Sequence, residues 1–319
     1  MDTDRLQRRR ALSRTVSRLS RSSVAECLAQ AAPTQETIAW RIGVTGAPGA
    51  GKSSLINRLL PLRVAGLGEA SEIAVIAIDP TSPRTGGALL GDRVRMDAAA
   101  DNSRIFIRSV ASGSSNDGLA DNVVDLLHEI DAAGFAETIL ETVGVGQAEH
   151  ASSALVDTLL VVVHPDAGDS IQAMKSGLAE FADIFVVNKS DLPGAKGASQ
   201  ELKAILAHRR AVGGEWRPMV LPVSSREGSG LEDLNAAINE HRAWKAGRRD
   251  PGRVSLVRRS YHLRSLLARH AAEMLAADSA GALTGPDLAV SYARLVGLIT
   301  DSLPGRNASM SANQPGRTT

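Results

Sequence analysis

A glycine-rich run that ends in lysine and serine carries the clearest chemistry in this 319-residue sequence. Its residues are Gly46, Ala47, Pro48, Gly49, Ala50, Gly51, Lys52 and Ser53, followed by Ser54. They match G-x-x-x-x-G-K-[ST], in which backbone N–H groups surround a phosphate, the lysine reaches the terminal phosphates and the hydroxyl binds Mg²⁺. An apolar run precedes this motif and a helical pattern, Lys52–Leu60, follows it. The motif therefore predicts a nucleotide-phosphate site in which Lys52 is catalytic.

A second polar motif follows the apolar run Ile184–Val187 and predicts recognition of guanine. The Asp191 carboxylate can accept hydrogen bonds from guanine N1–H and its exocyclic amine, whereas adenine offers an acceptor and no donor there. A buried polar mismatch of this kind discriminates by several orders of magnitude. Asn188 and the stem of Lys189 are expected to brace the loop and flank the base. Backbone N–H groups after a later strand would complete the pocket, at Ser224, Ser225 and Arg226. The expected ligands are GTP and GDP.

Three carboxylates between these motifs are candidates for a Mg²⁺ site and its surrounding network. Asp79 and Glu141 each end a predicted strand, and Asp92 lies in a glycine-rich loop. Mg²⁺ prefers oxygen ligands, some of them through water, and a carboxylate at a strand end opposite a phosphate loop is a usual partner. The predicted metal set is therefore Ser53, Asp79, Asp92 and Glu141, with Asp92 and Glu141 also counted as catalytic.

Short β-branched runs alternate with helical patterns over residues 39–246, which predicts a mostly parallel sheet with helices on both faces. The expected strands are Arg41–Thr45, Ile73–Ile78, Arg104–Ile107, Thr138–Leu140, Thr158–Val163, Ile184–Val187 and Met219–Val223. Together with the phosphate motif, this pattern predicts an α/β fold of the P-loop NTPase class, extended by helices at both ends.

The flanking segments differ from this central GTPase domain. Residues 1–38 are expected to form a helical extension, residues 247–303 a helical arm used for dimerisation, and residues 304–319 a disordered tail. The arginine-rich start fits an amphipathic helix, with Leu6, Ala11, Val16 and Leu19 roughly on one side, or a targeting peptide.

Composition excludes several classes of function. A net charge of +1 and only 3% aromatic residues give no support for nucleic-acid binding. The single cysteine, Cys27, rules out an internal disulfide framework, and no apolar run approaches the roughly 20 residues needed to cross a bilayer. We expect a cytoplasmic protein with no nucleic-acid or membrane partner.

Five segments closely resemble the MeaB/ArgK/MMAA family of GTPases: GAPGAGKS, IDPTSPRTGGALLGDRVRM, ETVGVGQAE, DAGDSIQAMKSGL and VVNKSD. The resemblance is dense from Arg41 to Asp191. It implies a homodimer that acts as a chaperone for an adenosylcobalamin-dependent acyl-CoA mutase of the methylmalonyl-CoA type. It also implies that Asp79, Asp92 and Glu141 belong to the magnesium and switch network, and that Lys175 lies on a third mobile loop that signals the nucleotide state.

The sequence departs from the family pattern in the third switch, where Ser170 follows Asp169 in place of an acidic residue, and after Gly118, where a basic pair is missing. The Ras-type glutamine position after Gly144 holds Val145, and no arginine finger is evident. We therefore expect slow unassisted turnover, at about 10⁻³ to 10⁻² per second.

Three other functions stay open at this level. One is a P-loop kinase or ATPase linked to arginine and ornithine transport, a label the family has carried. The second is another metallocentre-assembly GTPase, although one cysteine and no metal-spaced histidine pair offer it few ligands. The third is an assembly factor whose only output is dimerisation.

Overall fold

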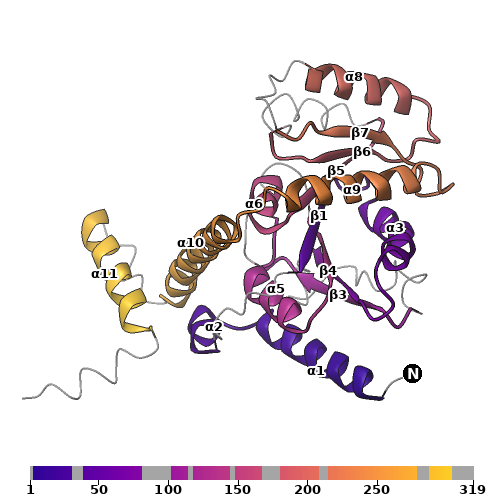
Figure 1. The fold of residues 1–319 in the computed structure, drawn as a ribbon. Helices are drawn as coiled ribbons and strands as arrows, with labels where there is room; N and C mark the ends of the chain where they lie inside the picture. The colour runs from indigo at the N-terminus through magenta and orange to yellow at the C-terminus, as the bar shows by residue number, and fades with distance from the viewer. Residues whose placement is uncertain are drawn as a thin grey trace, which may run out of the picture.

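The computed structural model describes residues 3–30, 39–80, 102–113, 118–143, 148–166, 180–207, 215–278 and 287–303. In this part of the chain, seven parallel strands form one sheet in the order β3-β2-β4-β1-β5-β6-β7 (Figure 1). The strands are β1 (Trp40–Gly46), β2 (Ile73–Asp79), β3 (Ile105–Ala111), β4 (Glu137–Glu141), β5 (Thr158–Val163), β6 (Ile184–Val187) and β7 (Met219–Pro222).

Helices cover both faces of the sheet, as the apolar strands require. On one face, Leu55 of α3 (Lys52–Gly66) and Leu234 of α9 (Leu231–Ala246) pack with Ile42 of β1. On the other face, α1 (Thr3–Leu19), α5 (Val123–Ala132) and α6 (Ala148–Leu155) pack against β2, β3 and β4. Helix α8 (Ala195–Ala207) packs against β6 and β7. The prediction of an α/β fold with a parallel sheet is confirmed.

The phosphate motif lies at the topological switch point of the sheet, where the chain stops adding strands on one side of β1 and starts adding them on the other. From β1 the chain passes through α3 to β2, which lies beyond β4, whereas β5 lies on the other side of β1. Ligands of open parallel sheets bind outside the carboxyl ends of the strands at such a point. The loop after β1 and the ends of β4 and β6 therefore share one edge.

Strand β3 and helix α3 extend well past their predicted ends. Strand β3 runs to Ala111, not to Ile107, because its half-exposed residues Arg108 and Ser109 still pair with β2. Helix α3 continues to Gly66 although Pro61 lies inside it. Proline removes one helical hydrogen bond, but Leu59, Leu60 and Val64 beside it are buried. Their burial offsets that cost.

The N-terminal extension contains α1 and α2 (Val24–Gln30). Its apolar side differs from the prediction, since Leu12, Val16 and Leu19 are buried while Ala11 is exposed. Two of its arginines have a structural role: Arg5 and Arg9 pair with Glu72, at 2.8 and 2.7 Å.

Two C-terminal helices, α10 (Pro251–Ala277) and α11 (Leu288–Asp301), extend away from the sheet (Figure 1). Asp250 and Asp287 cap them by accepting hydrogen bonds from backbone N–H groups of the first turn. Large apolar side chains on both are exposed, among them Leu263, Leu267 and Tyr292. In the described parts of the chain, every helix is too short or too polar to span a bilayer.

Candidate functional site

The glycines of the loop after β1 are required by the backbone path. Gly46 has a φ of 142°, and a Cβ there would lie 2.1 Å from the Val162 carbonyl oxygen of β5. Gly49 and Gly51 also have positive φ, 78° and 86°, and Gly51 is the N-cap of α3. A side chain at these positions would strain the loop or push it off the sheet. The glycines therefore let the backbone turn tightly between β1 and α3.

Lys52, the first residue of α3, bends back over this loop. Its Nζ donates hydrogen bonds to the carbonyl oxygens of Gly46 and Ala47, at 2.8 and 3.3 Å. The positive charge thus lies where the helix N-terminus also favours anions. This geometry suits a phosphate chain, to which the flexible lysine stem can carry the ammonium group.

Ser53 and Glu141 come together in the way that the Mg²⁺ hypothesis requires. The Ser53 hydroxyl donates to Glu141 Oε1 at 2.7 Å, and Glu141 is 4% exposed at the end of β4, in register with Val44 of β1. Asp79 is also buried but ends β2, one strand further from the loop. A hydroxyl and a carboxylate are the hard oxygen donors that Mg²⁺ prefers, so these residues fit the ion. Asp92 and Lys175 lie outside the described residues.

Asn188 connects three pieces of the site. Its Nδ2 donates to the carbonyl oxygens of Ala50 and Gly51, at 2.8 and 3.3 Å. Its Oδ1 accepts from the backbone N–H and the hydroxyl of Ser225, at 3.2 and 2.8 Å. The amide is 1% exposed, so it links the phosphate loop to the 224–226 segment by buried hydrogen bonds.

Asp191 is held by the segment that follows β7. The Ser224 hydroxyl donates to its Oδ1 at 2.5 Å, and this bond, helped by the positive charges of Arg226 and Lys189, lowers the pKa of the carboxyl. Lys189 turns the chain between Asn188 and Asp191 with a φ of 56°, the left-handed region. Asp191 is thus an oriented, ionised acceptor at the edge of the sheet.

Arg58 is a further residue of this site that the motifs do not indicate. Its Nε donates to the Ser225 carbonyl oxygen and its Nη2 to that of Arg226, each at 3.0 Å. The only sequence signal is its position on α3, within two turns of Lys52.

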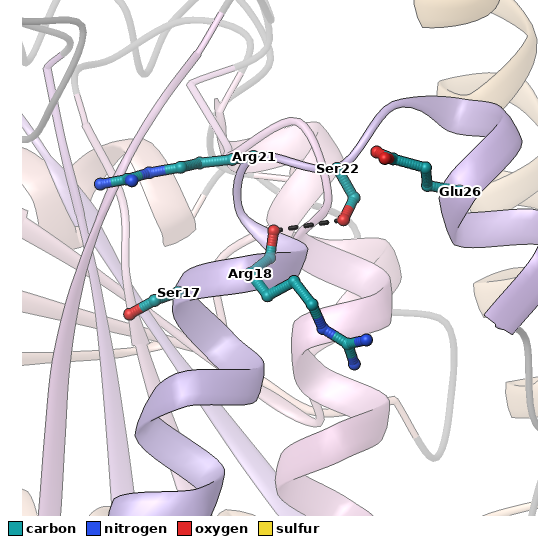
Figure 2. Close-up of a pocket in the computed structure, with 5 residues that line it drawn as sticks. All are labelled: Ser17, Arg18, Arg21, Ser22 and Glu26. Carbon is teal, nitrogen blue, oxygen red and sulfur yellow. Dashed lines mark hydrogen bonds between the residues drawn. The ribbon is translucent and has the colours of Figure 1, made fainter.

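A separate hollow lies at the turn between α1 and α2 (Figure 2). Ser17, Arg18, Arg21, Ser22 and Glu26 line it, and the Ser22 hydroxyl donates to the Arg18 carbonyl oxygen at 3.2 Å. Figure 2 shows the guanidinium groups of Arg18 and Arg21 pointing in opposite directions, so they do not converge on one anion. None of these residues belongs to the loops described above.

The parallel sheet with a glycine-rich loop at its point of reversal defines a P-loop NTPase. A family model described as "Methylmalonyl Co-A mutase-associated GTPase MeaB" matches residues 9–279. This chain belongs to that family, which confirms the resemblance.

Several relatives agree with this assignment. The chain is 36% identical over 243 residues to the GTPase ArgK of Escherichia coli, covering 74% of this chain and 70% of that one. It is 39% identical over 173 residues to a fused isobutyryl-CoA mutase of Paraburkholderia xenovorans, covering 53% of this chain and 14% of the relative. A crystal structure of a protein described as a LAO/AO transport system kinase matches with a TM-score of 0.58 and 25% identity, covering 94% of this chain and 95% of that one.

A relative from an archaeon is also matched over only part of its length. A Pyrococcus abyssi relative is 44% identical over 211 residues, which are 65% of this chain and 63% of the relative. The chain therefore spans less than two thirds of that relative's length.

Proposed function

We propose that this chain binds GTP with Mg²⁺, hydrolyses it to GDP and phosphate, and couples that cycle to an adenosylcobalamin-dependent acyl-CoA mutase. The observation that carries the nucleotide proposal is the buried amide of Asn188, which joins the phosphate loop to the segment that orients Asp191. Asn188 bonds to Ser225 and Asp191 bonds to the adjacent Ser224, so this segment connects the proposed phosphate site to the proposed guanine-selective carboxylate.

In the proposed reaction, a water oxygen attacks the γ-phosphorus while the bond from that phosphorus to the β–γ bridging oxygen breaks. GDP leaves with the electron pair, and the water proton passes to phosphate. Lys52 and the backbone N–H groups of residues 46–54, among which Pro48 has none, would hold the phosphates in line. Ser53, Asp79, Asp92 and Glu141 would hold Mg²⁺. A bound Mg²⁺ supplies charge neutralisation at the phosphates.

At the other end of the pocket, Asp191 would select the base. Asn188 and Lys189 would flank it. The backbone N–H groups of Ser224 and Ser225 donate to the Ser229 carbonyl oxygen and to Asn188 Oδ1, so of the three predicted donors the Arg226 N–H would contact the base. We further propose slow unassisted turnover, because no water-orienting glutamine follows Gly144 directly and no arginine finger is evident in the sequence.

The proposed client is a mutase of the methylmalonyl-CoA type, onto which the GTPase cycle would load adenosylcobalamin and which it would then protect. Support comes from the family description and from the relative in which a similar segment belongs to a fused mutase. Loops ordered by the γ-phosphate relax after hydrolysis, and a partner can read that change. Lys175 is proposed to lie on one of these loops.

We propose that residues 39–246 form the GTPase domain and that the helices of residues 247–303 mediate a homodimer, with residues 1–38 as a second extension and 304–319 as a tail. The exposed apolar side chains of α10 and α11 support this, since such surface is characteristic of interfaces. Leu263→Asp combined with Leu267→Asp should convert a dimer into a monomer in light scattering. A monomeric parent protein would contradict the dimer.

Two measurements test the nucleotide and partner proposals. Calorimetry with Mg²⁺ should show GDP and GTP bound much more tightly than ADP or ATP, and equal affinities would contradict guanine selection. Release of inorganic phosphate should be slow alone and faster with an adenosylcobalamin-dependent mutase. Phosphate appearing on a small-molecule acceptor would favour the kinase alternative, since the similar crystal structure is described as that of a transport system kinase.

A further inference from the structure

We infer that Arg58 is a positioning residue for base recognition: it holds the backbone of the 225–226 segment so that the Arg226 N–H faces the guanine carbonyl. This inference rests on the proposed GTP site and adds to it a residue outside every motif. Arg58 lies on α3, the same helix that begins at the phosphate loop. One side chain would thus connect the rigid phosphate-binding helix to the base-binding loop.

Arg58 holds two neighbouring carbonyl groups at once. The Arg58 guanidinium donates from Nε to the Ser225 carbonyl oxygen and from Nη2 to the Arg226 carbonyl oxygen, both at 3.0 Å. A planar guanidinium with two donors on neighbouring carbonyls fixes the orientation of two successive peptide groups, which a single flexible ammonium group cannot do.

Peptide geometry fixes the direction of the N–H groups beside these carbonyls. A trans peptide is planar, with its carbonyl and N–H pointing in opposite directions. In the peptide that follows Arg226, the carbonyl oxygen is held by Arg58, and the N–H of Glu227 donates to the Ser224 hydroxyl at 3.1 Å. That hydroxyl donates in turn to Asp191. The side of the segment facing away from α3 is therefore the side that orients Asp191.

The Arg226 N–H is the donor that this arrangement orients. Because Arg58 also holds the Ser225 carbonyl oxygen, the Arg226 N–H of the same peptide faces away from α3, toward the Asp191 side. A donor there suits the C6 carbonyl oxygen of guanine, whereas Asp191 suits N1–H and the exocyclic amine. Arg58 would therefore act on the C6 carbonyl contact and not on the contacts of Asp191.

Guanine and hypoxanthine share the C6 carbonyl and N1–H but differ in the exocyclic amine, so GDP and IDP separate the two contacts. Because the Arg58 side chain is exposed, its hydrogen bonds are worth less than buried ones. Arg58→Ala should weaken binding of GDP and IDP by the same factor, about three- to fivefold, and leave their affinity ratio unchanged. Arg58→Lys should restore part of the loss. Binding of inorganic tripolyphosphate, which probes the phosphate loop alone, should stay at the parent value.

The matched control is Arg14→Ala, which removes an exposed arginine of α1 and should leave both nucleotide affinities unchanged. The inference is overturned if Arg58→Ala binds GDP like the parent protein. It is also overturned if tripolyphosphate binding falls by the same factor, because α3 as a whole is then distorted. Failure of the parent protein to bind GDP would instead overturn the proposed function.

Discussion

The side-chain amide nitrogen of Asn188 donates a hydrogen bond to the Ala50 carbonyl oxygen, 2.8 Å away across 138 residues of sequence. Both residues are buried, at 1% and 0% exposure. Replacement of Asn188 by alanine would leave the buried Ala50 carbonyl oxygen without this donor. An unsatisfied buried acceptor costs free energy. The bond thus ties the shape of the phosphate loop to the loop that reads the base.

Asn188→Ala should therefore weaken GDP binding about 10- to 100-fold, because two loops lose their common support. Fluorescence titration with a labelled GDP measures this loss, and inorganic tripolyphosphate should lose affinity as well. That second loss distinguishes Asn188 from Arg58, whose removal should spare the phosphate loop. A GDP affinity within twofold of the parent value would disprove the link.

The acid limit of GDP binding should depend on Ser224. The Ser224 hydroxyl lowers the pKa of the Asp191 carboxyl, so the ionised form needed for base recognition persists below the usual carboxyl range. Because the pKa of Asp191 is lowered, GDP binding is complete at any pH above the ordinary carboxyl pKa. It is lost only as the pH falls through the lowered pKa of Asp191. Ser224→Ala should move that loss to higher pH. Titrations of GDP affinity between pH 7 and 3 would show it, and superimposable profiles would refute it.

Magnesium dependence should report on the contact between Ser53 and Glu141. Glu141→Gln keeps the shape of the side chain but removes its charge, and it should weaken Mg²⁺ binding to the GTP complex about 10- to 100-fold. Binding of GDP measured with a chelator present provides the internal control and should be unaffected. If Glu141→Gln instead leaves the Mg²⁺ titration unchanged, the carboxylate does not belong to the metal site.

Much of the fold could be predicted because strands buried on both faces read as continuous apolar runs. Strands β5 and β6 match their predicted ranges for this reason. Strand β3 was predicted too short because it lies at the edge of the sheet, where Arg108 and Ser109 break the apolar run. The order of the strands in the sheet cannot be predicted from the local sequence pattern. Strand β1 pairs with β4 and β5, and neither of these is next to β1 in the sequence.

The site was predictable where chemistry imposes a fixed spacing, as in residues 46–53 and 188–191. It was not predictable where one long side chain spans the fold, as Arg58 does, because an arginine on a helix carries no motif. The roles assigned to Asp92 and Lys175 stay predictions, since these residues lie outside the described part of the chain.

Arg41 illustrates the same limit in the core. It reads as the start of a strand, yet its side chain is 1% exposed and pairs with Asp131 at 2.6 Å. Nearby, Arg258 of α10 reaches Asp157 at 3.1 Å, and burial lowers the pKa of Arg258 to about 10. These charges join β1, α5 and α10 in an arrangement that only the folded chain reveals.

This buried cluster also makes stability depend on His128 of α5. Burial, reinforced by the charges of Arg41, His262 and Arg258 and opposed by Asp125, lowers the pKa of His128 from 6.5 to about 4. Its ring lies 5.8 Å from that of His262, measured between ring centroids. Between these two pKa values His128 is therefore neutral in the folded state but protonated in the unfolded chain.

Between pH 6.5 and 4 the unfolded chain binds more protons at His128 than the folded chain, so stability is present above pH 6.5 and falls as pH drops toward 4. Because the ring is partly exposed, we expect a contribution of about 2 kcal/mol, less than the full pKa shift implies. Urea unfolding measures the free energy of unfolding at pH 7.5 and at pH 5. The fall between these two values should be smaller for His128→Gln than for the parent protein. His150→Gln, at an exposed histidine of α6, serves as the control and should keep the parent slope. Equal falls in the free energy of unfolding of all three proteins would mean that acid destabilisation arises from other groups.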